Sequence, residues 1–341
     1  MEAPETPYEQ SHHHRCQILL RPPIRLRGAM SRALILGTRG SKLAVHQSEW
    51  VQARLRELAP GLTISLKRIQ TSGDKILDVP LANIGGKGLF VKEIEDALLS
   101  GEIDLAVHSM KDVPTALPDG LDILCVPPRE DARDAFITRD GGRLGELKPG
   151  ARIGTSSLRR QAQLLHHRPD LVIEMLRGNL DTRLRKLREG QFDAIVLAAA
   201  GLRRLGWDAE ITEYLPVELS LPAIAQGALG IEARRDDHVV RDLLARFEHR
   251  PTRITVTAER ALLHRLEGGC QVPIAAHASL DGDSLTLDGL VASVDGRRMI
   301  RQQIRGQAAD AHQLGTTLAE RLLAAGADVI LKEIYGRASW S

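Results

Sequence analysis

Apolar and polar positions along this chain alternate between two spacings, and the alternation predicts strands and helices in turn. Residues 33–37 form a short apolar run, residues 43–58 place apolar side chains at helical spacing, and residues 62–66 alternate apolar with polar side chains. The same order of strand and helix resumes between residues 151 and 197. A chain that repeats strand and helix in this way folds as α/β units, so we expect two such units.

The pattern changes after about residue 251. Two helical patterns there surround three strand-like segments, at residues 275–280, 284–287 and 299–304. Asp-Gly pairs predict hairpin turns and fall at residues 281–282, 288–289 and 295–296. We therefore expect a small α+β domain that opens with a helix leading to Cys270 and closes with a helix near residues 314–331. Residues 1–30 show no such periodicity, and we expect them to form a disordered extension.

Composition limits the kinds of site that this chain can carry. Its 341 residues are 43% hydrophobic and 26% charged, enough for the cores of two or three domains, but only 3% are aromatic. We therefore expect a ligand to be held by charge rather than by stacking on rings. No apolar run reaches the roughly 18 residues of a membrane span, so we expect no membrane partner. Cys16, Cys125 and Cys270 are far apart and odd in number, which argues against a disulfide framework or a metal site and favours a reducing cytoplasm.

The expected strand ends carry cations and hydroxyl groups. In open α/β sheets, ligands bind beyond the carboxyl ends of the strands, where helix N-termini and fixed arginines hold carboxylate or phosphate groups. Four such loops supply Arg39, Ser41, Lys111, Thr155, Ser156, Ser157, Arg159, Arg160, Arg177 and Arg183. Residues 152–204 hold ten arginines and one lysine against five acidic residues, a net charge of +6, while the whole chain carries +2. This concentration predicts an anion-binding site. Nucleic acid is a rival ligand, which the single aromatic residue of that window, Phe192, disfavours.

Asp112 is a carboxylate in a loop otherwise lined with cations. It follows Lys111 directly, so one interpretation is a helix cap or a simple ion pair. The other is a carboxylate that meets a positive charge on the ligand, where it would stabilise a developing cation or move a proton. The residues alone leave both interpretations open.

Two glycine-rich turns carry side chains that can do chemistry. Cys270 follows Gly268 and Gly269, which let the backbone take positive φ and approach another group closely. A lone cysteine at a turn is commonly an ordinary small residue, unless other residues supply chemistry for it. Lys87 lies in a segment that looks like a phosphate loop, but no Ser or Thr follows the lysine, and we exclude a nucleotide site there.

Five motifs in order resemble the hydroxymethylbilane synthase family, also called porphobilinogen deaminase. They are VHSMKDVP at 107–114, GTSSLRR at 154–160, LRGN with TR at 176–183, AGLRRL at 200–205 and EGGC at 267–270. Each motif alone is weak, but the set is specific, and the resemblance covers about residues 34–331. The departures are few: Gly40 stands where a bulkier polar residue is expected, Lys42 follows Ser41, and the N-terminal extension is the larger difference.

The resemblance implies a transferase. Enzymes of this family join four porphobilinogen molecules head to tail, release ammonia at each condensation, and hydrolyse the linear hydroxymethylbilane from the protein. A dipyrromethane cofactor would hang by a thioether from Cys270, and Asp112 would stabilise positive charge on the pyrrole nitrogens and help to transfer protons. The residues implied to bind cofactor and substrate carboxylates are Arg39, Ser41, Lys111, Thr155, Ser156, Ser157, Arg159, Arg160, Arg177, Arg183 and Arg204, with Lys87, Phe90 and Gln226 as further candidates.

The same resemblance implies two α/β domains like those of periplasmic binding proteins, set around a cleft, and a small α+β third domain that carries the cofactor cysteine. The expected domains span residues 31–128 with about 223–246, residues 129–222, and residues 247–341. We expect porphobilinogen as the substrate, no metal and no nucleic acid, a monomer, and a cytoplasmic location. The alternative is a non-catalytic two-lobed anion-binding protein, because a fold alone does not decide a function.

Overall fold

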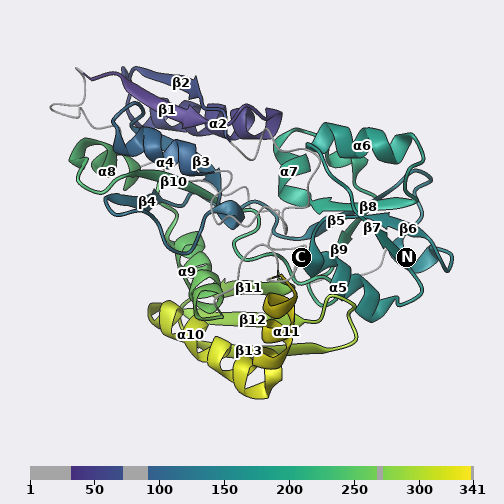
Figure 1. Ribbon diagram of the computed structural model, residues 1–341. Coiled ribbons are helices and arrows are strands. Elements are labelled where there is room, and N and C mark those ends of the chain that lie inside the picture. Colours follow the sequence, from purple (N-terminus) through teal and green to yellow (C-terminus); the bar gives the residue numbers. More distant parts are fainter. Residues whose placement is uncertain (1–31, 72–90, 267–271, 339–341) are drawn as a thin grey trace, which may run out of the picture.

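The computed structural model describes residues 32–71, 91–266 and 272–338, and Figure 1 shows three bodies of secondary structure. Two of them are five-stranded sheets flanked by helices, and the third is a three-stranded sheet packed against helices. Within the described ranges, no helix is long and apolar enough to cross a membrane. The segment 1–30, expected as a separate extension, lies outside the described residues.

The first sheet is mixed, with helices on both faces. Its strands lie in the order β2 (Ile64–Arg68), β1 (Leu34–Thr38), β3 (Leu105–Ser109), β10 (Leu229–Arg234) and β4 (Leu121–Cys125). Strand β1 is parallel to β2 and β3, whereas β10 is antiparallel to β3 and β4. The helices α2 (Lys42–Leu58) and α8 (His238–Leu244) cover one face, and α4 (Lys92–Leu99) covers the other. Helix α2 buries Val51, Leu55 and Leu58, which follow helical spacing and so share one side of the helix.

The second sheet is built in the same way. Its strands lie in the order β7 (Val172–Glu174), β6 (Arg152–Gly154), β8 (Ala194–Ala198), β5 (Asp134–Thr138) and β9 (Glu213–Leu215). Strand β6 is parallel to β7 and β8, and β5 is antiparallel to β8 and β9. Helix α5 (Leu158–His167) covers one face, and α6 (Leu180–Arg188) and α7 (Ala199–Arg204) cover the other. Short 3₁₀ turns lie nearby at η4 (Leu144–Glu146) and η5 (Asp208–Glu210).

The chain crosses between the two sheets twice. In each sheet the fourth position is filled by a strand that enters from the other body: β5 follows the first sheet in sequence, and β10 follows the second. The connections, residues 126–133 and 216–228, therefore cross between the two α/β domains side by side. Because β10 joins the first sheet, we propose the domain limits expected from the sequence, with residues 223–246 assigned to the first domain.

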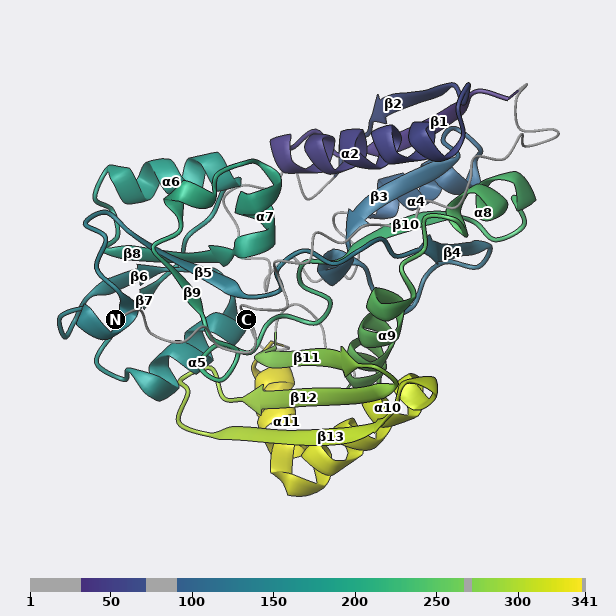
Figure 2. The ribbon, with the colours of Figure 1, turned by 180° about the vertical axis from the view of Figure 1, so that it is seen from behind.

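The third body is a separate antiparallel sheet. Its strands β11 (Ile274–Asp281), β12 (Ser284–Ala292) and β13 (Met299–Gln307) pair in sequence order. The helices packed against it are α9 (Arg250–Arg265), α10 (Ala311–Leu322) and α11 (Asp328–Ala338), with η6 (Ala308–Asp310) before α10 and η7 (Leu323–Ala327) after it. Figure 2 shows α10 and α11 behind the sheet. Ala275, Leu290 and Ala292 form a buried apolar cluster with Ala162 and Leu221 of the second domain, so this body also rests on that domain. The fold class predicted from the sequence, two α/β domains and a small α+β domain, is confirmed.

Of the three predicted hairpin turns, two are confirmed and one is wrong. Gly282 and Gly296 have φ of 56° and 71° and lie between successive strands. Gly289, by contrast, lies inside β12. A side chain there would place its Cβ only 2.7 Å from Leu262 of α9, so this glycine lets the helices approach the sheet closely.

Candidate functional site

A cavity of about 640 Å³ lies between the two α/β domains. The first domain lines it with the ends of β1, β2 and β3 and the start of α2, and the second domain lines it with Ser156, residues 177–181, Arg183, Leu205 and Trp207. The carboxyl ends of parallel strands and the N-terminus of a helix thus meet at one place, as expected for a ligand site in sheets of this kind.

Positive charge dominates the described part of the cavity lining. Six cationic side chains, Arg39, Lys42, Arg68, Lys111, Arg177 and Arg183, stand against Asp112 and Asp181. Burial, together with the nearby Arg160 and Arg177, lowers the pKa of Arg183 to about 10. Desolvation also lowers the pKa of Lys111, although Asp112 opposes the change, and Arg160 and Arg159 lower it further. A lowered pKa means that the surroundings disfavour the cationic form of the side chain. A bound anion would stabilise that form.

Asp112 is the catalytic candidate, and its backbone holds it at the cavity wall. Strand β3 ends at Ser109, and the 3₁₀ turn η3 (Met110–Asp112) follows at once. Both Lys111 and Asp112 line the cavity. The neighbouring Gln47 is buried and donates from Nε2 to the Ser109 hydroxyl over 3.2 Å. Sequence reasoning missed Gln47, because a glutamine inside a helical pattern carries no chemical signal.

Three predicted hydroxyl residues have local structural partners. The Ser41 hydroxyl accepts the Ala44 N–H over 3.3 Å and caps α2. The Ser157 hydroxyl accepts the Arg160 N–H and caps α5, and Thr155 Oγ1 accepts the Ser157 N–H over 3.2 Å. Such caps fix the start of a helix, where free N–H groups face a ligand. Ser41 and Ser156 line the cavity, whereas Thr155 and Ser157 are not part of its lining.

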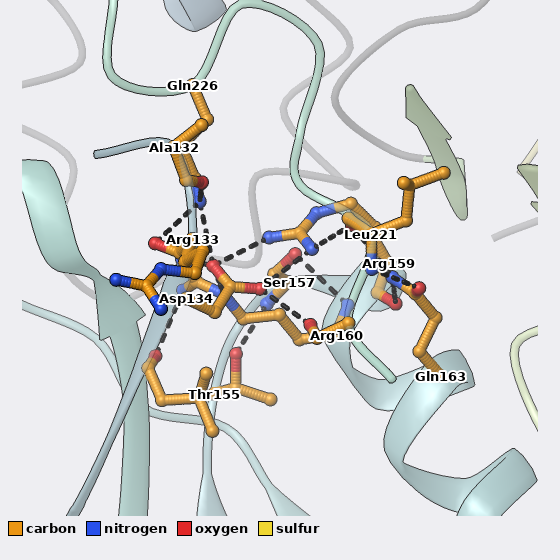
Figure 3. A network of polar contacts seen from close by, with 12 residues as sticks. Ala132, Arg133, Asp134, Thr155, Ser157, Arg159, Arg160, Gln163, Leu221 and Gln226 are labelled. Atoms are coloured by element: carbon orange, nitrogen blue, oxygen red, sulfur yellow. Dashed lines mark hydrogen bonds and ion pairs between the residues drawn. The ribbon is translucent and has the colours of Figure 1, made fainter. Parts of the chain in front are cut away.

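Arg159 and Arg160 are buried together on Asp134, which Figure 3 shows at the centre of a polar network. Arg159 Nη1 donates to Asp134 Oδ2 over 2.8 Å, and Arg160 Nη2 donates to Oδ1 over 2.8 Å. Ser220 and Gln226 donate to the same carboxylate. Although burial alone would raise it, the two guanidinium groups hold the pKa of Asp134 well below its ordinary value. The sequence reasoning missed Asp134, which lies 25 residues before its first partner.

Arg204 and Gln226 lie where the chain crosses between the domains. Arg204 Nη2 donates to the Gly227 carbonyl over 2.6 Å, and burial lowers its pKa to about 10. Gln226 Nε2 donates to the Ala132 carbonyl over 2.7 Å, which ties one crossing segment to the other. The structure therefore divides the predicted residues into a group that lines the cavity and a group that does not. Cys270, Lys87 and Phe90 lie outside the described residues.

Family comparisons cover nearly all of the described chain. A family model described as "Porphobilinogen deaminase, dipyromethane cofactor binding domain" matches residues 34–242, and one described as "Porphobilinogen deaminase, C-terminal domain" matches residues 253–324. The chain belongs to the porphobilinogen deaminase family. The family resemblance predicted from the motifs is confirmed, and the alternative of a non-catalytic anion-binding protein is not favoured.

This chain matches several porphobilinogen deaminases over almost the full length of those proteins. The porphobilinogen deaminases of Geobacter metallireducens and Geobacter sulfurreducens are each 59% identical over 304 residues, which cover 89% of this chain and 95% of the relative. The Syntrophotalea carbinolica enzyme of the same name is 60% identical over 301 residues, covering 88% and 96%. Among solved structures, the L-cystine solute receptor of Neisseria gonorrhoeae is 13% identical with a TM-score of 0.36, and the match covers 63% of this chain and 84% of that receptor.

The porphobilinogen deaminase cofactor, dipyrromethane, fits the residues that are present. Each of its pyrroles carries two carboxylates, and the cavity offers an excess of cations to meet them. The Nε atoms of Arg159 and Arg177 are both buried, and neither has a hydrogen-bond partner among the described residues. A buried donor without an acceptor is costly unless a ligand satisfies it.

A cation–π contact between two lining residues links the two porphobilinogen deaminase lobes at the cavity. The ammonium of Lys42, at the start of α2, lies 4.7 Å from the centre of the Trp207 ring in the second domain. Both residues line the cavity. Lys42, noted above as a departure from the family pattern, therefore forms a cation–π contact between the domains.

Proposed function

We propose that the cavity between the two α/β domains is the site at which four porphobilinogen molecules are condensed. Family membership makes the chain a transferase that forms hydroxymethylbilane with release of ammonia. The observation that supports this location is the cationic cavity wall with Asp112 set among its charges. Each incoming pyrrole brings an acetate and a propionate, which match that wall in charge.

We assign the cavity-lining residues to the binding of pyrrole carboxylates. Arg39, Ser41, Lys111, Ser156, Arg177 and Arg183 would hold cofactor and substrate there. The predicted residues outside the cavity lining, Thr155, Ser157, Arg159, Arg160 and Arg204, would add to this site from the second domain. Arg159 and Arg160 carry two positive charges against the single charge of Asp134, so one positive charge remains for a carboxylate. Gln226, Lys87 and Phe90 stay further candidates.

The cofactor would be attached through a thioether to Cys270. When bound, dipyrromethane supplies the free pyrrole α-carbon on which the first condensation takes place. Helix α9 ends at Arg265, and β11 begins at Ile274, so residue 270 belongs to the connection between them. The protein's own part is to bind the carboxylates and to keep water from the reacting carbon.

Asp112 would perform the proton chemistry. As the amino nitrogen of the aminomethyl group leaves as ammonia, the methylene carbon stays on the pyrrole, positive charge spreads to the ring nitrogen, and a carboxylate facing that N–H stabilises the charge. The same carboxylate would accept the proton lost from the α-carbon after the new bond forms. Replacing Asp112 by Asn keeps the shape and removes the charge, so we expect kcat to fall about 10²- to 10⁴-fold.

The first test is an intact-protein mass spectrum of the purified chain beside a Cys270→Ser variant. We expect the unsubstituted chain to carry two condensed pyrrole units and the variant to lack them. Failure to acquire the two units, even after incubation with porphobilinogen, would overturn the attachment. A monomeric state, the absence of a nucleic-acid partner and a cytoplasmic location remain proposals. The scarcity of cysteine supports the cytoplasmic location.

A further inference from the structure

The loop that carries Asp112 rests on an arginine of the third domain. Arg260 lies in α9, and its guanidinium donates two hydrogen bonds to the first domain. Arg260 Nη1 donates to the Val113 carbonyl over 2.9 Å, and Nη2 donates to the Pro114 carbonyl over 2.6 Å. These two carbonyl groups directly follow Asp112. One planar guanidinium thus fixes two successive peptide groups, which a point charge does less well.

Arg260 is held there without a neutralising carboxylate. Burial, reinforced by the charge of Arg253, lowers the pKa of Arg260 to about 10. No ion pair is formed by Arg260 among the described residues, and the two carbonyl groups are the acceptors that satisfy it. Placing an unpaired charge in a desolvated position is unfavourable, so the contact is expected to serve a purpose beyond stability.

The Asp112 loop is also held at its start and through its apolar side chains. The Met110 N–H donates to the Ala228 carbonyl over 3.0 Å, which holds the loop at its start. The side chains of Met110 and Val113 are buried in the apolar cluster that also contains Leu262 and Leu266. Asp112 and its neighbour Lys111 are therefore the part of the loop that faces the cavity, while the residues on either side are fixed below.

We propose that Arg260 is a positioning residue for Asp112. It ties the Asp112 loop of the first domain to α9, a helix of the third domain. This inference rests on the catalytic role proposed for Asp112. Loss of Arg260 would free two peptide carbonyl groups and let the loop shift, and a misplacement of about 1 Å can lower a catalytic rate about 100-fold.

The test compares Arg260→Met with Arg253→Met in steady-state kinetics with porphobilinogen. Arg253 lies two turns earlier on α9 and also donates to a first-domain carbonyl, that of Ile123, over 3.1 Å, but it does not touch the Asp112 loop. We expect Arg260→Met to lower kcat about 10- to 100-fold, with KM changed less than about threefold, because the cavity cations are untouched. Arg253→Met should keep kcat within about twofold. Mass spectrometry of each variant checks that the two pyrrole units are present.

Two further variants separate positioning from general stability. Arg260→Lys keeps a donor within reach of the carbonyl groups and should recover at least about half of the lost kcat on a logarithmic scale. In an Asp112→Asn background, Arg260→Met should lower kcat by less than about twofold further, because the group that it positions is already gone. A full additional loss in that background, or equal losses in the two arginine variants, would overturn the proposal.

The same set of variants distinguishes this inference from the proposed function. If Asp112→Asn retains the kcat of the unsubstituted chain, the catalytic assignment fails, whatever Arg260 does. If Asp112→Asn loses its rate and Arg260→Met behaves like Arg253→Met, the catalytic assignment stands and the positioning role is refuted. Should Arg260→Met fail to fold, Arg260→Lys and Arg260→Gln measured against Arg253→Met give the same comparison.

Discussion

Replacing Asp134 by Asn should destabilise the second domain far more than a single substitution usually does. The carboxylate accepts hydrogen bonds from Arg159, Arg160, Ser220 and Gln226, and it is completely buried. An asparagine has nearly the same shape but no charge, and its amide would point a donor at guanidinium donors. Two buried guanidinium groups would then remain without a counter-ion.

The magnitude follows from the geometry. Breaking one buried ion pair by removing a partner costs about 3–5 kcal/mol, and here one carboxylate neutralises two arginines whose side chains are only 5% and 7% exposed. We therefore expect a loss of about 4 kcal/mol, equivalent to a fall in Tm of roughly 8–16 °C. The pKa of Asp134 is depressed in the folded state. Its contribution is therefore fully present above the ordinary value of 3.8 and decreases only at lower pH.

Scanning calorimetry at pH 7 measures the loss, with Glu189→Gln as the matched control. Glu189 pairs with Arg185 over 2.6 Å on the exposed side of α6, and these side chains are 42% and 62% exposed. Removing that charge should change the free energy of unfolding by less than about 0.5 kcal/mol. A loss below about 1 kcal/mol for Asp134→Asn would refute the view that this carboxylate neutralises the two arginines.

Three other predictions concern charge. Burial and the nearby Glu232 raise the pKa of Glu95 from 4.5 to about 7. The stabilising effect of the bound proton is therefore lost as pH rises from 4.5 toward 7. In urea unfolding, the free energy of unfolding of Glu95→Gln should rise by about 1–3 kcal/mol relative to the unsubstituted chain between pH 5 and pH 8. A difference that stays constant over this range would contradict the prediction. Raising the salt concentration from about 0.05 to about 0.5 M should raise the KM for porphobilinogen several-fold by screening the cavity cations, and an unchanged KM would count against charge-based capture. Lys42→Met and Trp207→Leu should show a coupling energy of about 0.5–1 kcal/mol in a double-mutant cycle of urea unfolding, with additivity as the contrary result.

The fold was largely predictable because its signal is local. Helix α2 and strands β1 and β2 follow from the spacing of apolar residues, and each buries the side that the pattern indicates. Strands β5 and β9 escaped prediction, since β9 has only three residues and β5 opens on a charged one, Asp134. Their place in the sheet is decided by distant neighbours, which no short window of sequence contains.

The site was predictable in its chemistry but only partly in its geometry. Motif matching selected both the residues at the cavity wall, such as Lys111, and those outside its lining, such as Arg160. Nothing in their sequence environment separates the two groups, because both kinds of arginine follow strand ends. The division depends on Asp134, a partner brought close only when β5 and β8 pair.

The return of β10 to the first sheet also sets an order in which the protein can be completed on the ribosome. All strands of the second sheet lie between residues 134 and 215, so that sheet has every strand as soon as this stretch has been translated. The first sheet begins at residue 34, yet β4 reaches the other strands only through β10, residues 229–234. Although N-terminal domains usually fold first during synthesis, the sheet that emerges first here is finished last, and its exposed β3 edge must wait about 120 residues for its neighbour.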